Sequence, residues 1–286
     1  MKITGVTMIT GIFGYPVEHS LSPAMQNAAI ETTGVDMVYL PFSVEPARLE
    51  GAVGGIRALN LTGVNITIPH KETVMEYLDE VSDEARIIGA INTIVNRDGR
   101  LIGHNTDGDG YLTSLKEETG FNPAGKSIVI IGAGGAARGI INALAREGAG
   151  SIIIANRTLS RAERLAAEFE PLYPSVAFTP FPLDSAPLRE SFATAALIIN
   201  TTSLGMEGRG TIKLPLDVLP KNSIVSDIVY KPRTTDFLRR AADLGLETHD
   251  GLGMLVCQGA LGFTLWTGRE APIDVMRRTA EEALGG

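Results

Sequence analysis

Two polar side chains, Lys71 and Asp107, could together carry out proton transfer. Lys71 ends the run Asn65-Ile-Thr-Ile-Pro-His-Lys71, which reads as a strand with polar residues at its exit. Ligands collect at the carboxyl ends of strands in open α/β sheets, and a lysine beside a carboxylate can exchange the proton that accompanies hydride transfer to a carbonyl. The turn Asn105-Thr-Asp-Gly108 offers such a carboxylate. Each residue also has a structural interpretation, as an exposed lysine at a helix start and as an N-cap of the following helix.

Other polar residues stand where apolar ones are expected, or at a helix start. Asn92 lies in an apolar strand, where a buried amide needs partners and could bind a hydroxylated substrate. Ser20 and Ser22 precede a helix with Pro23 at its first position; Ser22 could be its N-cap, or both hydroxyls could bind a carboxylate there. Gln258 interrupts an apolar helix face, where it could equally form an interhelical hydrogen bond.

The stretch 127–139 has the pattern of a dinucleotide-binding turn. The apolar run Ile128–Ile131 ends at Gly132, and a helical pattern follows. Gly132 suits the tight turn, Gly134 the close approach of a pyrophosphate, and Ala137 the packing of the helix on the strand. The free N–H groups and the dipole of that helix favour an anion.

The residues after the next strand indicate which dinucleotide this turn binds. Ile152–Ala155 is followed by Asn156, Arg157 and Thr158, where a protein that binds NAD usually has an acid for the ribose. An arginine can instead hold a 2′-phosphate through a charge-assisted, bidentate contact. Asn156 or Thr158 could also merely cap the next helix. We predict NADP as the cofactor.

Composition excludes several classes of protein. The chain has 286 residues, a formal net charge of −8 and no basic run, so we expect no nucleic-acid partner. Cys257 is the only cysteine, which excludes an intramolecular disulfide and a cysteine-rich metal site; the four histidines lack metal-ligand spacing, so no metal is expected. The N-terminus lacks a signal-peptide pattern and no long apolar window occurs, so we expect a cytoplasmic protein without membrane contact. The sequence leaves the oligomeric state open, with a homodimer as one option.

Two α/β regions must position these residues. The first alternates strands and helices and ends in a hairpin; we expect strands at Met8–Phe13, Val38–Phe42, Val64–Ile68, Ile91–Val95 and Leu101–His104, and helices at Ala24–Thr32, Ala47–Leu59, Glu72–Leu78 and Asp83–Ile88. A helix at Tyr111–Glu118 leads to the second region, a parallel sheet with strands at Ile128–Ile131, Ile152–Ala155, Val176–Phe178, Ala196–Asn200 and Ile224–Ile228, and helices after Gly135 and Ser160 and at Thr235–Leu244. Two final helices, Leu252–Thr267 and Ile273–Leu284, should pack back on the first region.

The predicted fold class is therefore α/β with two domains. Residues 1–107 and 251–286 would form a discontinuous substrate-binding and catalytic domain. Residues 108–250 would form an inserted Rossmann-type NADP-binding domain.

Taken in order, the motifs resemble the shikimate dehydrogenase family over nearly the whole chain. The matching segments are Ser20-Leu-Ser-Pro23, Asn65 to Lys71, Ile91-Asn-Thr93, Asn105 to Gly108, Gly132-Ala-Gly-Gly-Ala136, Asn156-Arg-Thr158, Asn200-Thr-Thr-Ser203, and Asp250 to Val256 with Gln258. The resemblance implies reversible NADPH-dependent reduction of 3-dehydroshikimate to shikimate in aromatic amino acid biosynthesis. It also implies catalysis in a cleft between the substrate domain and the inserted NADP domain. One departure is Gln26-Asn27, where the family typically has His-Asn; we expect altered packing beneath the serines and no effect on the chemistry.

The resemblance also assigns site residues by position. It implies that Lys71 and Asp107 are the catalytic pair, with the formal acid/base of the two left open. Substrate contacts would come from Ser20, Ser22, Thr67, Asn92 and Gln258, with Tyr230 at the edge of the cleft. Cofactor contacts would come from Gly132, Ala133, Gly134, Gly135, Ala136, Asn156, Arg157, Thr158 and Arg161, with Ile228 and Gly251 near the nicotinamide.

Three alternatives stay open at this stage. The chain could be a quinate/shikimate dehydrogenase that uses NAD, although Arg157 argues against NAD. It could be a catalytically inactive homologue that senses pathway ligands, which the intact Lys71 and Asp107 disfavour. It could also be an NADP-binding domain joined to an unrelated substrate-binding half.

Overall fold

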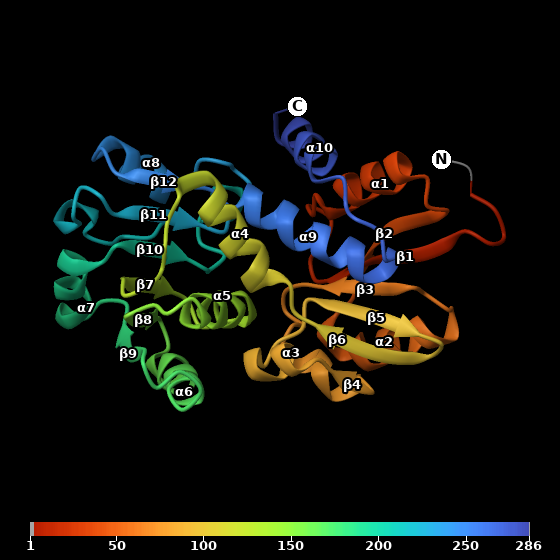
Figure 1. Cartoon of the computed structure of the whole chain (residues 1–286), viewed down its shortest axis with the longest axis horizontal. Helices are drawn as coiled ribbons and strands as arrows, with labels where there is room; N and C mark the ends of the chain where they lie inside the picture. Colours follow the sequence, from red (N-terminus) through yellow and green to blue (C-terminus); the bar gives the residue numbers. More distant parts are fainter. Residues whose placement is uncertain (1–2, 286) are drawn as a thin grey trace. The chain divides into compact units, whose positions relative to one another are not determined.

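The computed structural model describes residues 3–285 and divides them into two compact units (Figure 1). The first unit comprises the residues up to Gly110 together with those from Leu255 onward, and the second is the contiguous segment Tyr111–Met254. The divisions fall inside helices α4 (Asp107–Thr119) and α9 (Leu252–Thr267).

The first unit contains a mixed six-stranded sheet of order β2-β1-β3-β5-β6-β4. Strands β1, β2 and β3 are parallel, whereas β5 runs antiparallel to both β3 and β6. The strands are β1 (Met8–Gly14), β2 (Met37–Ser43), β3 (Gly63–Ile66), β4 (Glu80–Val81), β5 (Thr93–Arg97) and β6 (Arg100–His104). The helices are α1 (Ser22–Thr33), α2 (Leu49–Ala58), α3 (Asp83–Ile88) and α10 (Ile273–Gly285), and α1 packs against α10.

A tight hairpin sets the geometry of one edge of this sheet. Asp98 and Gly99 both have positive φ, 52° and 87°, as a two-residue turn between twisted strands requires. The turn reverses the chain, so that Thr93 at the start of β5 is in register with His104 at the end of β6 and with Asn65 near the end of β3. The segments that follow β1, β3 and β6, and the one that precedes β5, therefore lie together at one end of the sheet, which we call the shared edge.

The second unit contains a parallel sheet of order β12-β11-β10-β7-β8-β9. The strand order reverses between β7 and β10, which is the arrangement of Rossmann folds and confirms the predicted class. The strands are β7 (Ser127–Ile131), β8 (Ser151–Asn156), β9 (Ala177–Pro182), β10 (Leu197–Asn200), β11 (Ile224–Asp227) and β12 (Glu247–His249). The helices are α5 (Gly135–Arg146), α6 (Leu159–Phe169), α7 (Ala186–Ser191) and α8 (Asp236–Asp243).

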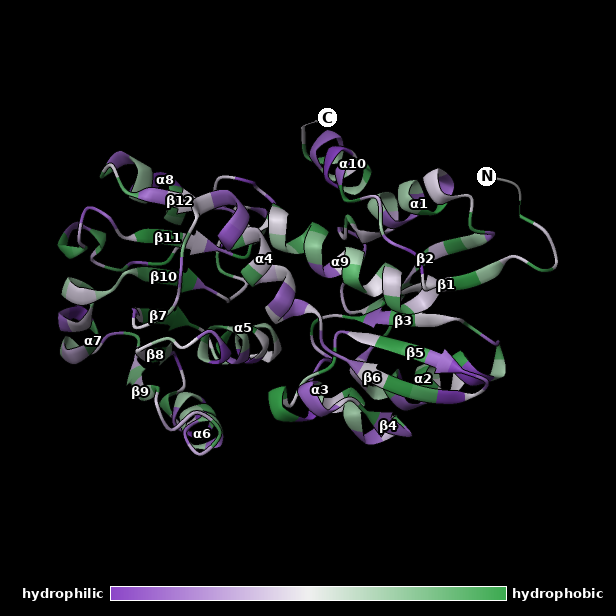
Figure 2. Ribbon diagram, in the orientation of Figure 1, coloured by the Kyte–Doolittle hydropathy of each residue, from purple (hydrophilic) through white to green (hydrophobic). Residues whose placement is uncertain are grey.

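Apolar residues fill both faces of the second sheet. Ile128 and Ile130 of β7 belong to one buried cluster, and Val129 and Ile131 belong to another. Figure 2 shows the resulting continuous hydrophobic colour on β7 and β10. Burial on both faces explains why these strands are apolar without alternation. Within residues 3–285, no helix is long and apolar enough to cross a membrane.

Several elements differ from the predicted ones. The helix expected at Glu72–Leu78 is a short 3-10 helix, Thr73–Tyr77, and the helix expected at Tyr111–Glu118 begins four residues earlier, at Asp107. Another 3-10 turn precedes α2. The strands β4 and β12 and the helix α7 were not expected; β4 and β12 are edge strands of two or three residues, too short for an alternating pattern.

Candidate active site

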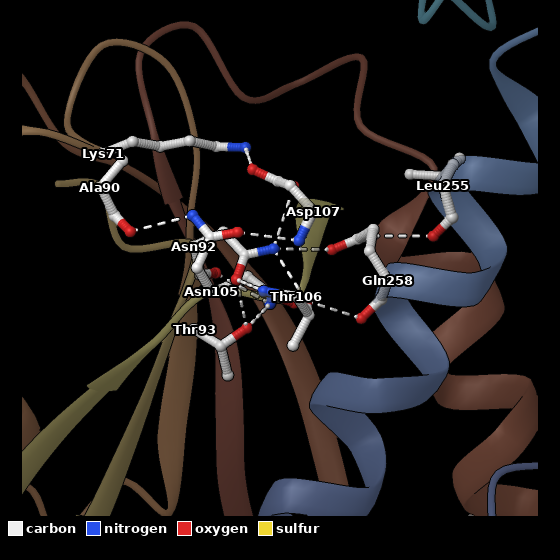
Figure 3. A network of polar contacts seen from close by, with 10 residues as sticks. Lys71, Ala90, Asn92, Thr93, Asn105, Thr106, Asp107, Leu255 and Gln258 are labelled. Carbon is white, nitrogen blue, oxygen red and sulfur yellow. Dashed lines mark hydrogen bonds and ion pairs between the residues drawn. The ribbon is translucent and has the colours of Figure 1, made fainter. Parts of the chain in front are cut away.

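A desolvated ion pair lies at the shared edge of the first sheet. The Nζ atom of Lys71, in the segment after β3, lies 2.5 Å from Oδ2 of Asp107, the first residue of α4 (Figure 3). The Lys71 side chain is 15% exposed and that of Asp107 is 4% exposed. Lys71 is not an exposed lysine at a helix start, because its side chain is largely buried. Asp107 is not the N-cap of α4, because the carbonyl of Thr106 accepts the first helical hydrogen bond and Thr106 therefore occupies that position.

The amide of Asn92 connects this ion pair to other elements. Its Nδ2 lies 3.0 Å from the second carboxylate oxygen of Asp107, 2.8 Å from Oγ1 of Thr106 and 3.3 Å from Oε1 of Gln258. The backbone N–H of Thr106 donates to Asn92 Oδ1 over 2.8 Å. Because a backbone N–H can only donate, the amide oxygen of Asn92 faces Thr106 and its NH2 group faces the carboxylate.

Helix α9 brings Gln258 to the same network (Figure 3). Besides accepting from Asn92, Gln258 donates through Nε2 to the carbonyl of Leu255 in its own helix. The hydroxyl of Thr106 donates to the backbone oxygen of Gln258 over 3.0 Å. A Cβ at Gly110 would lie 2.6 Å from the backbone nitrogen of Gln258, so glycine is needed there for this approach of α4 and α9.

Three further residues that were predicted to contact the substrate are not hydrogen-bonded to this network within residues 3–285; they are Ser20, Ser22 and Thr67. Ser22 begins α1 but is not its N-cap; that position is Leu21, and the Ser22 N–H donates to Oγ of Ser20 instead. Thr67, half-buried, follows β3 at the shared edge. Among residues 3–285, no hydrogen bond joins these three side chains to Lys71 or Asp107. Tyr230 belongs to the second unit, three residues beyond β11.

Gln26, the departure from the family pattern, lies one turn after Ser22. It is 1% exposed, and its Nε2 donates to the backbone oxygen of Gly259 over 2.8 Å. This bond connects α1 to α9 next to Gln258.

The glycine-rich turn after β7 leaves room for an anion. Gly132 has φ +114°, and a Cβ there would lie 2.5 Å from Oγ1 of Thr201. Gly134 is the N-cap of α5 and provides no side-chain cap, and no atom lies within 4 Å of a Cβ placed on it. The first turn of α5 carries no acidic residue. The open space beside Gly134, at the N-terminus of α5, is compatible with the predicted anion-binding turn.

Positively charged side chains follow β8. Arg157 and Arg161 are exposed, and no carboxylate ends this strand. Thr158 is at the N-cap position of α6 without a side-chain capping bond, whereas Asn156 donates to the carbonyl of Thr158 over 2.8 Å. These residues fit a phosphate on the ribose better than a free hydroxyl. Ile228 and Gly251 adjoin each other, since a Cβ at Gly251 would lie 2.2 Å from the Ile228 oxygen.

Sequence reasoning missed several buried polar residues around the ion pair. Four of them, Asn65, Thr93, Asn105 and Thr106, are buried and hydrogen-bonded within the network. The sequence could have indicated these residues, because they lie in the same motifs as Lys71, Asn92 and Asp107 and a polar residue in a buried strand needs a hydrogen-bond partner. His70 is also buried, with its ring Nε2 2.7 Å from the Val44 oxygen.

Asp227, the last residue of β11, is a second buried carboxylate that the sequence did not single out. It is fully buried and accepts from Asn200 Nδ2, the Val229 N–H and the Thr235 hydroxyl. Burial raises the pKa of Asp227 to about 6, although these hydrogen bonds oppose the rise. No group of three or more His, Cys, Asp or Glu side chains in the described part of the chain could hold a metal ion.

Comparisons with known proteins cover the whole chain. Residues 12–94 match the shikimate dehydrogenase substrate binding domain, residues 114–202 match shikimate / quinate 5-dehydrogenase, and residues 251–281 match the shikimate 5′-dehydrogenase C-terminal domain. The chain is 44% identical over 284 residues to the shikimate dehydrogenase (NADP(+)) of Geobacter metallireducens, covering 99% of each protein. It is 50% identical over 285 residues to that of Symbiobacterium thermophilum, covering 99% of this chain and 96% of the relative. A crystal structure of a shikimate dehydrogenase in complex with NADP+ has a TM-score of 0.91 and 40% identity, covering 99% of this chain and 98% of that one.

Proposed function

This chain belongs to the shikimate dehydrogenase family, and we propose that it catalyses the reversible NADPH-dependent reduction of 3-dehydroshikimate to shikimate. The observation that carries the proposal is the ion pair between Lys71 and Asp107, held at a sheet edge by Asn92. A proton donor that is both desolvated and fixed in orientation is what the reduction of a ketone requires.

Lys71 is the proposed proton donor. When bound, NADPH supplies the hydride for the carbonyl carbon. The substrate oxygen becomes negatively charged as the carbon is reduced, and the Lys71 ammonium donates a proton to it. Asp107 holds Lys71 through Oδ2 while Asn92 holds the other carboxylate oxygen, so the pair stays aligned. In the opposite direction the neutral amine of Lys71 accepts the hydroxyl proton.

Substrate recognition is proposed for the other predicted site residues. Ser20 and Ser22 lie at the start of α1, where a carboxylate is favoured, and Thr67 lies at the edge that carries Lys71. Asn92 and Gln258 present amide groups suited to substrate hydroxyls. Tyr230 is proposed as a further substrate contact. The predicted domain limits, the homodimer and the cytoplasmic location stay predictions.

We propose that the second unit holds NADP through the turn Gly132–Ala136 and through Asn156, Arg157, Thr158 and Arg161, with Ile228 and Gly251 beside the nicotinamide. A substitution of Arg157 tests this assignment, because a charge-assisted contact to a 2′-phosphate contributes about 1.5–3 kcal/mol to cofactor binding. Arg157→Ala should therefore raise KM for NADP by roughly 10–100-fold and leave KM for NAD unchanged. Arg164→Ala, which replaces an exposed arginine of α6, the helix that follows Arg157, is the matched control. Equal effects of Arg157→Ala on both cofactors would contradict the assignment.

The decisive assay is shikimate-dependent reduction of NADP+, followed by the absorbance of NADPH. We expect a higher kcat/KM for NADP than for NAD and for shikimate than for quinate. A preference for NAD and quinate would favour the quinate/shikimate alternative. No turnover, with thermal stabilisation by NADP but not by shikimate, would favour a binding protein with a different substrate half.

A further inference from the structure

A buried chain of hydrogen bonds lies behind Asn92, on the side away from Asp107. The Tyr39 hydroxyl donates to Asn65 Oδ1 over 2.7 Å, Asn65 Nδ2 donates to Thr93 Oγ1 over 3.1 Å, and the Thr93 hydroxyl donates to Asn92 Oδ1 over 3.0 Å. Tyr39, Asn65 and Thr93 are 1%, 5% and 0% exposed. None of the three was assigned a function above.

Two backbone groups fix the directions of the bonds in this chain: the carbonyl of Asn92 orients the Asn65 amide, and the N–H of Thr106 orients the Asn92 amide. Asn65 Nδ2 also lies 3.1 Å from the backbone oxygen of Asn92, which can only accept. The Asn65 nitrogen must therefore face that carbonyl, and its oxygen must face Tyr39. Because Thr93 Oγ1 accepts an N–H from Asn65, its own proton is directed to Asn92.

The amide oxygen of Asn92 thus receives two donors, the Thr93 hydroxyl and the backbone N–H of Thr106. A rotation of the amide by half a turn would place its NH2 group against both donors and its oxygen against the Asp107 carboxylate. Such an arrangement would leave several buried polar groups unpaired. The chain therefore selects the amide orientation in which Asn92 donates to Asp107.

We infer that Thr93 is a positioning residue for the proposed reaction, and that Tyr39 and Asn65 act through it. This inference rests on the proposed function, because its effect on turnover runs through Asn92 to the Asp107–Lys71 pair. Thr93 itself touches neither Lys71 nor Asp107 through any hydrogen bond within the described residues.

The first test compares one substitution that removes the Thr93 hydroxyl with one that keeps it. Thr93→Val keeps the shape and removes the hydroxyl, and we expect kcat/KM for shikimate to fall about tenfold, mostly through kcat. Thr93→Ser restores the hydroxyl and should recover most of that loss. Thr10→Val is the matched control, because Thr10 is equally buried in the same sheet and its hydroxyl donates only to the Gly63 carbonyl, 2.7 Å away. A Thr93→Val enzyme within twofold of the wild type, or an equal loss in Thr10→Val, would overturn the inference.

A double-mutant cycle separates positioning from a general loss of stability. In the Asn92→Ala background the Thr93→Val substitution should change kcat/KM by less than twofold, because the group that it orients is gone. An undiminished tenfold effect in that background would contradict the inference. Tyr39→Phe removes one oxygen from the far end of the chain and should lower kcat about threefold, which provides a second variant if Thr93→Val does not fold.

A spectroscopic readout makes the result independent of activity. In uniformly ¹⁵N-labelled protein, the side-chain NH2 resonances of Asn92 are identified by their loss in Asn92→Ala. We expect these resonances to move in Thr93→Val and to stay near the wild-type positions in Thr93→Ser and Thr10→Val. Unmoved resonances in Thr93→Val would reject the inference even in an active enzyme. An inactive wild type in which they move as expected would reject the proposed reaction alone.

Discussion

Two aspartates, one in each unit, are buried at the carboxyl end of a sheet strand, and they differ in what faces them. Asp107 is buried and its carboxylate forms an ion pair with the ammonium of Lys71. Asp227 is fully buried, and within residues 3–285 its hydrogen-bond donors are all neutral: the Asn200 amide, the Val229 N–H and the Thr235 hydroxyl. Burial without a cation disfavours the charged form, which is why the pKa of Asp227 is raised to about 6.

The difference shows that burial and residue type do not identify a catalytic carboxylate. Asp227 joins the ends of β10 and β11 to the start of α8 through its three hydrogen bonds, which stabilise the fold of the second unit. Asp107 orients a lysine that remains 15% exposed and can still reach a ligand. The charged partner therefore distinguishes the proposed proton-transfer site from Asp227.

The largest expected effect comes from removing that partner. Lys71→Ala should lower kcat by about 10²–10⁴-fold with a smaller change in KM, because a general acid is lost. Asp107 would then face only neutral donors, as Asp227 does, and the free energy of unfolding should fall by about 3 kcal/mol. Steady-state kinetics and urea unfolding measure the two effects. A near-wild-type kcat would break the distinction between the two aspartates.

Asp227 should make stability depend on pH in a direction opposite to that of paired carboxylates. The folded chain takes up its proton near pH 6, whereas the unfolded chain does so near the ordinary value of 3.8. The folded state therefore holds more protons between these values, and the contribution of Asp227 to stability rises as the pH falls from about 6 to about 4. The total change is at most about 3 kcal/mol.

Urea unfolding of the wild type and of Asp227→Asn at pH 7 and at pH 4.5 tests this. The wild type should gain stability relative to the variant at the lower pH. If the difference between the two proteins stays constant, Asp227 does not titrate in this range.

A smaller effect is expected from one neutral donor of Asp227. Thr235→Val removes the hydroxyl that donates to Oδ2 of Asp227, so the pKa of Asp227 should rise further and the pH window above should move upward. The substitution also removes the N-cap of α8, where Thr235 accepts from the Leu238 N–H, at a cost of about 1 kcal/mol. Thr235→Ser keeps both hydrogen bonds and is the control; an equal shift in both variants would exclude the hydroxyl as the cause.

The smallest effect is expected from a second lysine–carboxylate pair with the same separation. Lys116 Nζ lies 2.5 Å from Glu147 Oε2, but the lysine side chain is 42% exposed. Solvent screening limits such a pair to about 0.2–1 kcal/mol, and Lys116→Ala should leave kcat unchanged. A loss of turnover comparable with that of Lys71→Ala would show that the assays report general damage rather than the desolvated pair.

Local patterns predicted the parts of the molecule that depend on neighbouring residues. The turn between β7 and α5 was predictable because Gly132 follows an apolar run and opens a helix, and the hairpin was predictable from Asp98-Gly99. The residues Lys71, Asn92 and Asp107 could be proposed individually. Their contacts with one another depend on the sheet register, which the sequence alone does not determine.

The features that escaped prediction depend on distant partners. Thr93 and Asn65 look like ordinary strand residues until the register of β3 and β5 sets them side by side. Asp227 looks like the end of an apolar strand, because the local sequence does not indicate that Asn200 and Thr235 donate hydrogen bonds to it. The strands β4 and β12 have too few residues to show a period, and pairing with a neighbour decides their conformation.

The division of the first unit into two segments has a consequence for the order of folding. Gln258 bonds to Asn92 across 166 positions, and Gln26 bonds to Gly259 across 233. The second sheet, by contrast, is complete within Tyr111–Met254. During synthesis from the N-terminus, that sheet can form while the first unit still lacks α10 and most of α9. The hydrogen bonds around the Lys71–Asp107 pair can all form only after Gln258 of α9 has left the ribosome.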